Sequence, residues 1–186
     1  MSENTRPKWQ MNLPLQITWF RIWMVPVIVA CLWPNLVVWN IVAAVLFIIT
    51  SISDYYDGYF ARKFNAVSTM GKFLDPIADK ILVTSILVVL IPTQKIDPIM
   101  VIVILARDTF IGGIRSIAAA EGIIIAARPT GKWKTALQMV AIPAVMIDAN
   151  VGGVAFDKIG YWVLWISVVL SVTSGIQYYY GYLKNR

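Results

Sequence analysis

Six long apolar stretches, separated by short polar segments, constrain the fold of this chain more than any other feature. A helix needs about 20 predominantly apolar residues to cross the hydrocarbon core of a bilayer. The fifth stretch is the shortest, and we expect its helix to extend from Lys132 and to kink at Pro143. The pattern predicts an all-α polytopic membrane protein with six transmembrane helices. The stretches cover Ile17–Trp33, Leu36–Ser53, Leu74–Ile91, Ile99–Ala120, Ala136–Ile147 and Tyr161–Tyr180.

Composition supports the membrane class. The chain is 59% hydrophobic with a mean hydropathy of +0.70, which is too apolar for an ordinary soluble domain. Its 186 residues suggest one domain, residues 1–186. The net charge of +6 suits an anionic lipid surface, so we expect membrane lipids and no nucleic acid as partners. The N-terminus lacks a signal-peptide layout and is expected to be retained, with residues 1–15 forming a short interfacial segment.

Lysine and arginine are distributed unequally over the predicted loops. Ten lie on one side of the membrane and two, Lys95 and Lys158, on the other, while four fall within the apolar stretches. Cytoplasmic loops carry the excess of these residues, so both termini are predicted to be cytoplasmic. Several tryptophans, including Trp33 and Trp162, lie near the predicted helix ends, as interfacial anchors do.

The chain has no histidine and a single cysteine, Cys31. A general base must therefore be a carboxylate, lysine, tyrosine or cysteine. Cys31 lies in an apolar stretch, can form no internal disulfide, and is expected to be a small core residue.

Four aspartates flank the loop between the second and third stretches: Asp54, Asp57, Asp75 and Asp79. The first pair is three residues apart and the second pair four, so each pair shares a helix face. Two adjacent antiparallel helices joined by a loop of about ten residues, around Lys63–Lys72, would bring the four carboxylates to one membrane depth. Ionised carboxylates repel one another, and hard divalent cations would neutralise them and could bridge a diphosphate. The pattern thus predicts a metal site.

Small residues accompany these aspartates. Gly58 follows Asp57 directly, Ala61 lies one helical turn beyond it, and Gly71 lies four residues before Asp75. Small side chains allow a bulky ligand to approach the backbone, but they also serve close helix packing alone. Both interpretations stay open.

The full pattern resembles the signature of the CDP-alcohol phosphotransferase family. It reads Asp54-Tyr-Tyr-Asp57-Gly58-Tyr-Phe-Ala61-Arg62, then eight residues, then Gly71-Lys-Phe-Leu-Asp75-Pro-Ile-Ala-Asp79. Members are six-helix membrane enzymes, usually homodimers, which use Mg²⁺ or Mn²⁺ while a second alcohol displaces CMP from a CDP-alcohol. The resemblance implies metal binding, with two ions, by Asp54, Asp57, Asp75 and Asp79, and proton removal by Asp79. The residues that it implies for the CDP site are Gly58, Ala61, Arg62, Ser68 and Gly71.

A second group of charged residues bears on the acceptor alcohol. Arg107, Asp108 and Arg115 lie in the fourth stretch, followed by Lys132 and Lys134. Arginine binds phosphate or carboxylate bidentately, so this group suits an anionic acceptor. Two plainer interpretations remain: Arg115 could pair with Asp108, seven residues away, and Lys134 could be a solvated surface charge.

A wider set of segments resembles the bacterial phosphatidylglycerophosphate synthases of that family. The resemblance implies CDP-diacylglycerol and sn-glycerol 3-phosphate as substrates in a bacterial inner membrane, with the active site facing the cytoplasm. It implies that Arg107, Arg115 and Lys132 bind the acceptor phosphate and that Thr18 and Arg21 lie near the lipid headgroup, although Arg21 could simply snorkel. The segments are Pro14–Pro26, Ala106–Asp108, Arg115, Glu121–Gly122, Gly131–Thr135 and Gln138–Met139.

Other functions fit parts of the sequence. Within the family, the acceptor could be inositol phosphate, serine or another lipid, and serine is disfavoured because it has no phosphate. Intramembrane carboxylates also serve divalent-cation transporters, whose sites lie near the bilayer midplane and commonly between repeats. The chain shows no repeat, and its aspartates lie towards one membrane side. A non-catalytic lipid-binding scaffold would leave the aspartates unexplained.

Overall fold

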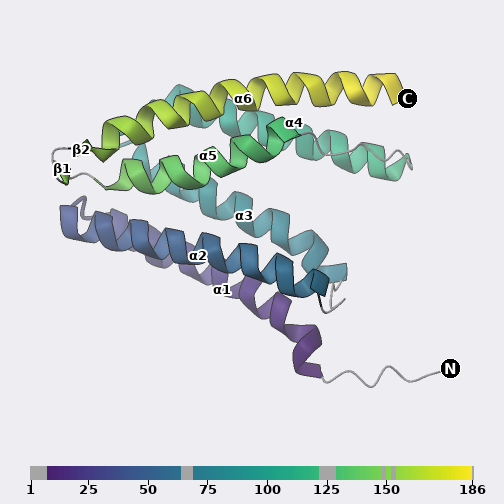
Figure 1. Ribbon diagram of the computed structural model, residues 1–186, viewed down its shortest axis with the longest axis horizontal. Coiled ribbons are helices and arrows are strands. Elements are labelled where there is room, and N and C mark those ends of the chain that lie inside the picture. Colours follow the sequence, from purple (N-terminus) through teal and green to yellow (C-terminus); the bar gives the residue numbers. More distant parts are fainter. Residues whose placement is uncertain (1–7, 64–68, 122–128, 148–149, 152–153, 186) are drawn as a thin grey trace. The chain divides into compact units, whose positions relative to one another are not determined.

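The structure is a computed structural model of the chain (Figure 1). It describes residues 8–63, 69–121, 129–147, 150–151 and 154–185. Side chains are described for residues 18–53, 74, 77–121, 131–147 and 154–184.

The described residues form six helices, and each predicted apolar stretch coincides with one of them. Where a stretch extends past its helix, it does so by one residue, as at Trp33 and Leu36. The prediction of an all-α fold with six helices is confirmed. The helices are α1 (Lys8–Leu32), α2 (Val37–Lys63), α3 (Thr69–Leu90), α4 (Pro98–Ala120), α5 (Pro129–Met146) and α6 (Phe156–Asn185).

Several helices continue beyond their apolar stretches. The second runs to Lys63 and the third starts at Thr69, and the residues between them, 64–68, lie outside the described part of the chain. Gly71 and Lys72, which were expected in the loop, therefore belong to α3. The first helix begins at Lys8, but residues 1–7 lie outside the described part of the chain, so the interfacial segment stays a prediction.

A short antiparallel hairpin, which the sequence did not predict, lies between α5 and α6. It consists of β1 (Asn150–Val151) and β2 (Val154–Ala155), with Asn150 opposite Ala155. Strands of two residues are too short to produce the alternating pattern by which strands are recognised.

The chain divides into two compact units, Met1–Val89 and Leu90–Arg186. In the first unit α1 packs against α2. Aliphatic and aromatic side chains from both helices are buried, among them Ile28, Leu32 and Phe47. The prediction of a single domain over residues 1–186 stays a prediction.

In the second unit α6 packs against both α4 and α5 (Figure 1). The hydroxyl of Tyr161, near the start of α6, donates to Asp97 just before α4 at 2.6 Å. The hydroxyl of Tyr182, near the end of α6, donates to Glu121 just after α4 at 2.8 Å. These two contacts show that α4 and α6 run in the same direction. Residues of α4 and α6 also form a hydrophobic core cluster, which consists of Ile111, Ile114, Ala118, Tyr178 and Tyr182.

Apolar length favours a membrane location most clearly for α6. Among the described residues, the segment Phe156–Lys184 is long and apolar enough to cross a bilayer. Two shorter apolar helical segments, Thr18–Leu32 and Val37–Ser53, lie in α1 and α2.

Candidate active site

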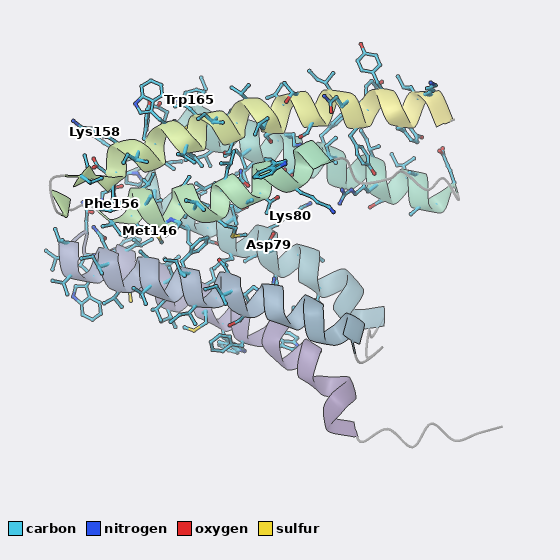
Figure 2. The ribbon with its side chains drawn as sticks, in the orientation of Figure 1. Asp79, Lys80, Met146, Phe156, Lys158 and Trp165 are labelled. Carbon is cyan, nitrogen blue, oxygen red and sulfur yellow. The ribbon has the colours of Figure 1, made fainter. Side chains whose placement is uncertain are left out.

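The four predicted metal ligands lie on two consecutive helices of the first unit. Asp54 and Asp57 are three residues apart in α2, and Asp75 and Asp79 are four apart in α3. With this spacing in a helix, each pair is expected to share one helix face, which stays a prediction. Asp79 is half-buried and is labelled on α3 in Figure 2.

The other side chains of this predicted site lie outside the described residues. These are Asp54, Asp57 and Asp75 among the metal ligands, and Gly58, Ala61, Arg62, Ser68 and Gly71 at the CDP site. The donor set still fits the predicted ion, because Mg²⁺ and Mn²⁺ prefer carboxylate oxygen ligands.

Thr18 and Arg21, predicted near the lipid headgroup, lie one helical turn apart in α1. Both are buried, and Arg21 is only 1% exposed. An arginine that snorkels keeps its charged group in water. Burial of the whole side chain argues against that interpretation and makes Arg21 a residue of the interior.

The side chain of Arg107 in α4 donates hydrogen bonds from all three of its nitrogen atoms, Nε, Nη1 and Nη2. Its Nε donates to the backbone carbonyl of Ser171 at 3.1 Å, and its Nη2 to the hydroxyl of Ser174 at 2.8 Å. Both partners belong to α6. Its Nη1 donates to Oδ1 of the neighbouring Asp108 at 3.0 Å. Arg107 is therefore fixed between α4 and α6.

Asp108 also binds Lys134 of α5. The Nζ atom of Lys134 donates to Oδ1 and Oδ2 of Asp108, at 2.5 Å and 2.6 Å. The side chain of Lys134 is 4% exposed and that of Asp108 22%. Residues from two helices, Arg107, Asp108 and Lys134, thus form one charge cluster, which α6 borders through Ser171 and Ser174. Among the described residues of this cluster, two cations against one anion leave one formal positive charge in excess.

The interpretation of Lys134 as a solvated surface charge is wrong. Lys134 and Gln138 are one helical turn apart and buried on the face of α5 that carries Ala141, Ile142 and Val145. Lys132, predicted as a phosphate ligand, is exposed. The spacing of Lys134 from these apolar residues was the signal that could have identified it.

Arg115 does not form the ion pair with Asp108 that was considered from their spacing. Its guanidinium carbon lies 5.4 Å from the ring centroid of Tyr178 in α6, a cation–π contact. The side chain is exposed, about 12 Å further along α4 than Arg107. Among the described contacts, none joins Arg115 or Lys132 to the charge cluster, so their role as phosphate ligands stays a prediction.

Two buried polar atoms of the same helices have no hydrogen-bond partner among the described residues. They are Nε2 of Gln138, one turn after Lys134, and Oγ of Ser171, whose carbonyl binds Arg107. Buried polar groups are normally paired, so such atoms beside a charge cluster favour a polar ligand.

Comparison with known proteins agrees with these features. The family described as CDP-alcohol phosphatidyltransferase matches residues 11–173. A Rickettsia bellii protein is 36% identical over 169 residues, covering 90% of this chain and 93% of its own. A Bacillus subtilis protein is 36% identical over 184 residues with the same coverage. A Haemophilus influenzae protein is 31% identical over 171 residues, covering 90% of this chain and 91% of its own.

All three relatives bear the name CDP-diacylglycerol–glycerol-3-phosphate 3-phosphatidyltransferase. The match extends over nearly the whole chain and includes the aspartates of α2 and α3 as well as Arg107, Asp108 and Lys134. The chain therefore belongs to the CDP-alcohol phosphatidyltransferase family.

Proposed function

We propose that this enzyme transfers the phosphatidyl group of CDP-diacylglycerol to sn-glycerol 3-phosphate, giving phosphatidylglycerophosphate and CMP. The relatives' shared name supports the reaction. The observation that favours an acceptor with a phosphate is the cluster of Arg107, Asp108 and Lys134, whose described residues carry one positive charge in excess. A small acceptor that bears a phosphate complements this charge, whereas serine does not.

The aspartate signature supports the chemistry of the transfer. In this proposal Asp54, Asp57, Asp75 and Asp79 hold two Mg²⁺ or Mn²⁺ ions, which neutralise the diphosphate of the CDP-lipid when bound. Gly58, Ala61, Arg62, Ser68 and Gly71 line the CDP site, and Thr18 and Arg21 lie near the lipid headgroup.

The proposed step is a single direct displacement. The acceptor hydroxyl forms a bond to the lipid phosphorus while the bond from that phosphorus to CMP breaks, and Asp79 takes the hydroxyl proton. Arg107 binds the acceptor phosphate, with Lys134 beside it. Arg115 and Lys132 remain candidate ligands from the family resemblance.

The proposed location is a bacterial inner membrane, crossed by six helices, with both termini and the active site on the cytoplasmic side. Large apolar side chains, among them Trp162, Ile166, Val169 and Ile176 on α6, are exposed on the isolated chain. Contiguous exposed apolar surface of this kind fits a lipid environment or a partner. A homodimer, usual in the family, is part of the proposal.

CMP release tests the function. Purified protein in detergent is supplied with CDP-diacylglycerol, Mg²⁺ and one acceptor: glycerol 3-phosphate, inositol phosphate or serine. We expect CMP release with glycerol 3-phosphate and none with inositol phosphate or serine. Chelation of the metal should abolish this release. Release only with inositol phosphate would contradict the proposed choice of acceptor, and no release with any acceptor would contradict the proposed function.

The mechanism has a test of its own. Exchange of labelled CMP into CDP-diacylglycerol without acceptor would contradict direct displacement, because it requires a covalent enzyme intermediate.

A further inference from the structure

We propose that α6 is a positioning element for Arg107 and thereby sets the affinity of the enzyme for its acceptor phosphate. The inference rests on the proposed function, in which Arg107 binds that phosphate. It concerns Ser171, Ser174 and Gly175 of α6. Ser174 and Gly175 lie beyond residues 11–173, the part of the chain that the family matches.

The contacts with α6 fix the plane of the guanidinium group. The Nε and Nη2 atoms form one edge of that planar group, and both donate to α6, to the Ser171 carbonyl and the Ser174 hydroxyl. With the bond to Asp108, three of the five N–H groups are used, so two are left among the described contacts. An arginine whose plane is fixed in advance loses less side-chain entropy when it binds an anion.

Ser174 is itself oriented to accept from Arg107. Its hydroxyl donates to the carbonyl of Ser171 at 3.0 Å, so the hydroxyl hydrogen points along its own helix. The oxygen lone pairs are then available to Nη2 of Arg107, 2.8 Å away. The Ser171 carbonyl thus joins the two contacts into one network.

Gly175 provides the space in which the Arg107 side chain lies. A Cβ atom at position 175 would lie 3.2 Å from Cγ and 3.5 Å from Nε of Arg107. The contact with Cγ is closer than an ordinary van der Waals distance, so the Arg107 side chain would have to move by a few tenths of an ångström. Alanine at this position should therefore shift the guanidinium group.

The chain offers a matched control for each change. Ser167 is a buried serine of the same helix, and its hydroxyl donates to the carbonyl of Leu164 at 2.7 Å. Gly113 is a glycine of α4 at which an added Cβ would meet nothing within 4 Å. Neither residue has a described contact with Arg107.

The test is the dependence of CMP release on glycerol 3-phosphate at saturating CDP-diacylglycerol, with the full chain in detergent. We expect Ser174→Ala and Gly175→Ala to raise the KM for glycerol 3-phosphate about tenfold, because a hydrogen bond to a charged group is lost or displaced. The KM for CDP-diacylglycerol should not change. Ser174→Thr, which keeps the hydroxyl, should restore most of the affinity, and Ser167→Ala and Gly113→Ala should leave both constants within about twofold.

A double-mutant cycle separates positioning from helix packing. Lysine lacks the planar group that α6 holds, so Ser174→Ala should have little further effect on KM in an Arg107→Lys background. The proposal is overturned if Ser174→Ala and Ser167→Ala raise KM equally, or if Ser174→Ala acts fully in both backgrounds. If Ser174→Ala does not fold, the KM values of Gly175→Ala and its control Gly113→Ala are compared instead. Equal values would then overturn the proposal. If the unchanged enzyme releases no CMP with glycerol 3-phosphate, the proposed function itself fails.

Discussion

Lys132 and Lys134 are two residues apart, yet their amines lie in opposite environments. Lys134 is buried against Asp108, whereas Lys132 is exposed. A separation of two residues is about 200° around a helix, so two lysines with this spacing cannot lie on the same face. The position of a charge relative to the apolar face of its helix therefore decides which lysine can serve a buried site.

Removing the buried lysine should cost stability. Lys134→Ala takes away one of the two described cations at Asp108, and loss of a partner from a buried pair is strongly destabilising. Because Asp108 is 22% exposed, water screens part of the effect, and we expect a loss of about 1–3 kcal/mol in the free energy of unfolding. Thermal unfolding in one detergent measures it.

Lys132→Ala is the matched control and should change stability by less than about 0.5 kcal/mol. The same two variants also test the acceptor site. If Lys132→Ala raises the KM for glycerol 3-phosphate and Lys134→Ala does not, Lys132 is the phosphate ligand, as the family resemblance implies.

A second prediction for a single residue concerns Asp79, the proposed base for the proton of the acceptor hydroxyl. Asp79→Asn keeps the size and polarity of the side chain but removes its basicity and one carboxylate of the proposed metal site. We expect CMP release to fall by at least about 100-fold, the usual contribution of a positioned general base. The circular dichroism of the variant should match that of the unchanged protein. A near-normal rate would show that Asp79 is not the base.

Of the charge cluster, the sequence predicted Arg107 as a phosphate ligand but neither the burial of Lys134 nor the contacts with α6. Arg107 was predicted as a phosphate ligand, and the structure holds it in place with described hydrogen bonds. Its partners Ser171 and Ser174 are 64 and 67 residues away in a helix without a recognisable motif. Contacts over such separations depend on how helices pack, which no local pattern reports.

At the scale of elements, the apolar stretches located all six helices because each stretch is predominantly apolar and the segments between them are short and polar. The helix ends were less predictable, since α2 continues beyond its apolar stretch to Lys63 and α3 begins before its own, at Thr69. These extensions contain Asp57, Gly58 and Gly71, whose helix propensity is low, so neither hydropathy nor propensity predicts them from the sequence.

The packing of α5 against α6 depends on one glycine. A Cβ atom at Gly160 would lie 2.6 Å from the backbone nitrogen of Val145 and 2.9 Å from the carbonyl oxygen of Ala141. Backbone atoms cannot move aside as the end of a side chain can, so the two helices would have to separate. We predict that Gly160→Ala destabilises the protein by about 1–3 kcal/mol, measured by thermal unfolding.

Gly113→Ala is again the comparison, because its added Cβ would meet nothing within 4 Å. Alanine has the higher helix propensity, by about 1 kcal/mol, so this change should be neutral or stabilising. Equal stability of the two variants would show that the close approach at Gly160 does not limit the packing of α5 against α6.

At the scale of the whole molecule, the parallel course of α4 and α6 agrees with the predicted topology. The bond between Tyr161 and Asp97 holds the starts of these two helices together. Lys95 and Lys158 lie next to these starts, and they are the two basic residues assigned to the side opposite the termini. The structure thus brings together two positions that the charge distribution had assigned to one side.

The crossing of the membrane by α6 can be tested directly. Lys158, labelled near the start of α6 in Figure 2, and Lys184, near its end, are both exposed. They are 26 residues apart in one helix, about 39 Å, which exceeds the hydrocarbon core of about 30 Å. If α6 crosses the bilayer, the two positions lie on opposite sides, and the ten-to-two distribution of basic residues puts Lys184 in the cytoplasm.

Cysteine labelling in spheroplasts measures this arrangement, in a Cys31→Ser background that removes the one native cysteine. A membrane-impermeant maleimide should label Lys158→Cys in intact spheroplasts, and Lys184→Cys only after the spheroplasts are permeabilised. The reverse pattern would mean that the charge distribution predicts the wrong orientation, although α6 still crosses. Labelling of both positions from the same side would mean that α6 does not cross, and the six-span topology would fail with it, because among the described residues α6 is the helix that is long and apolar enough to span a bilayer.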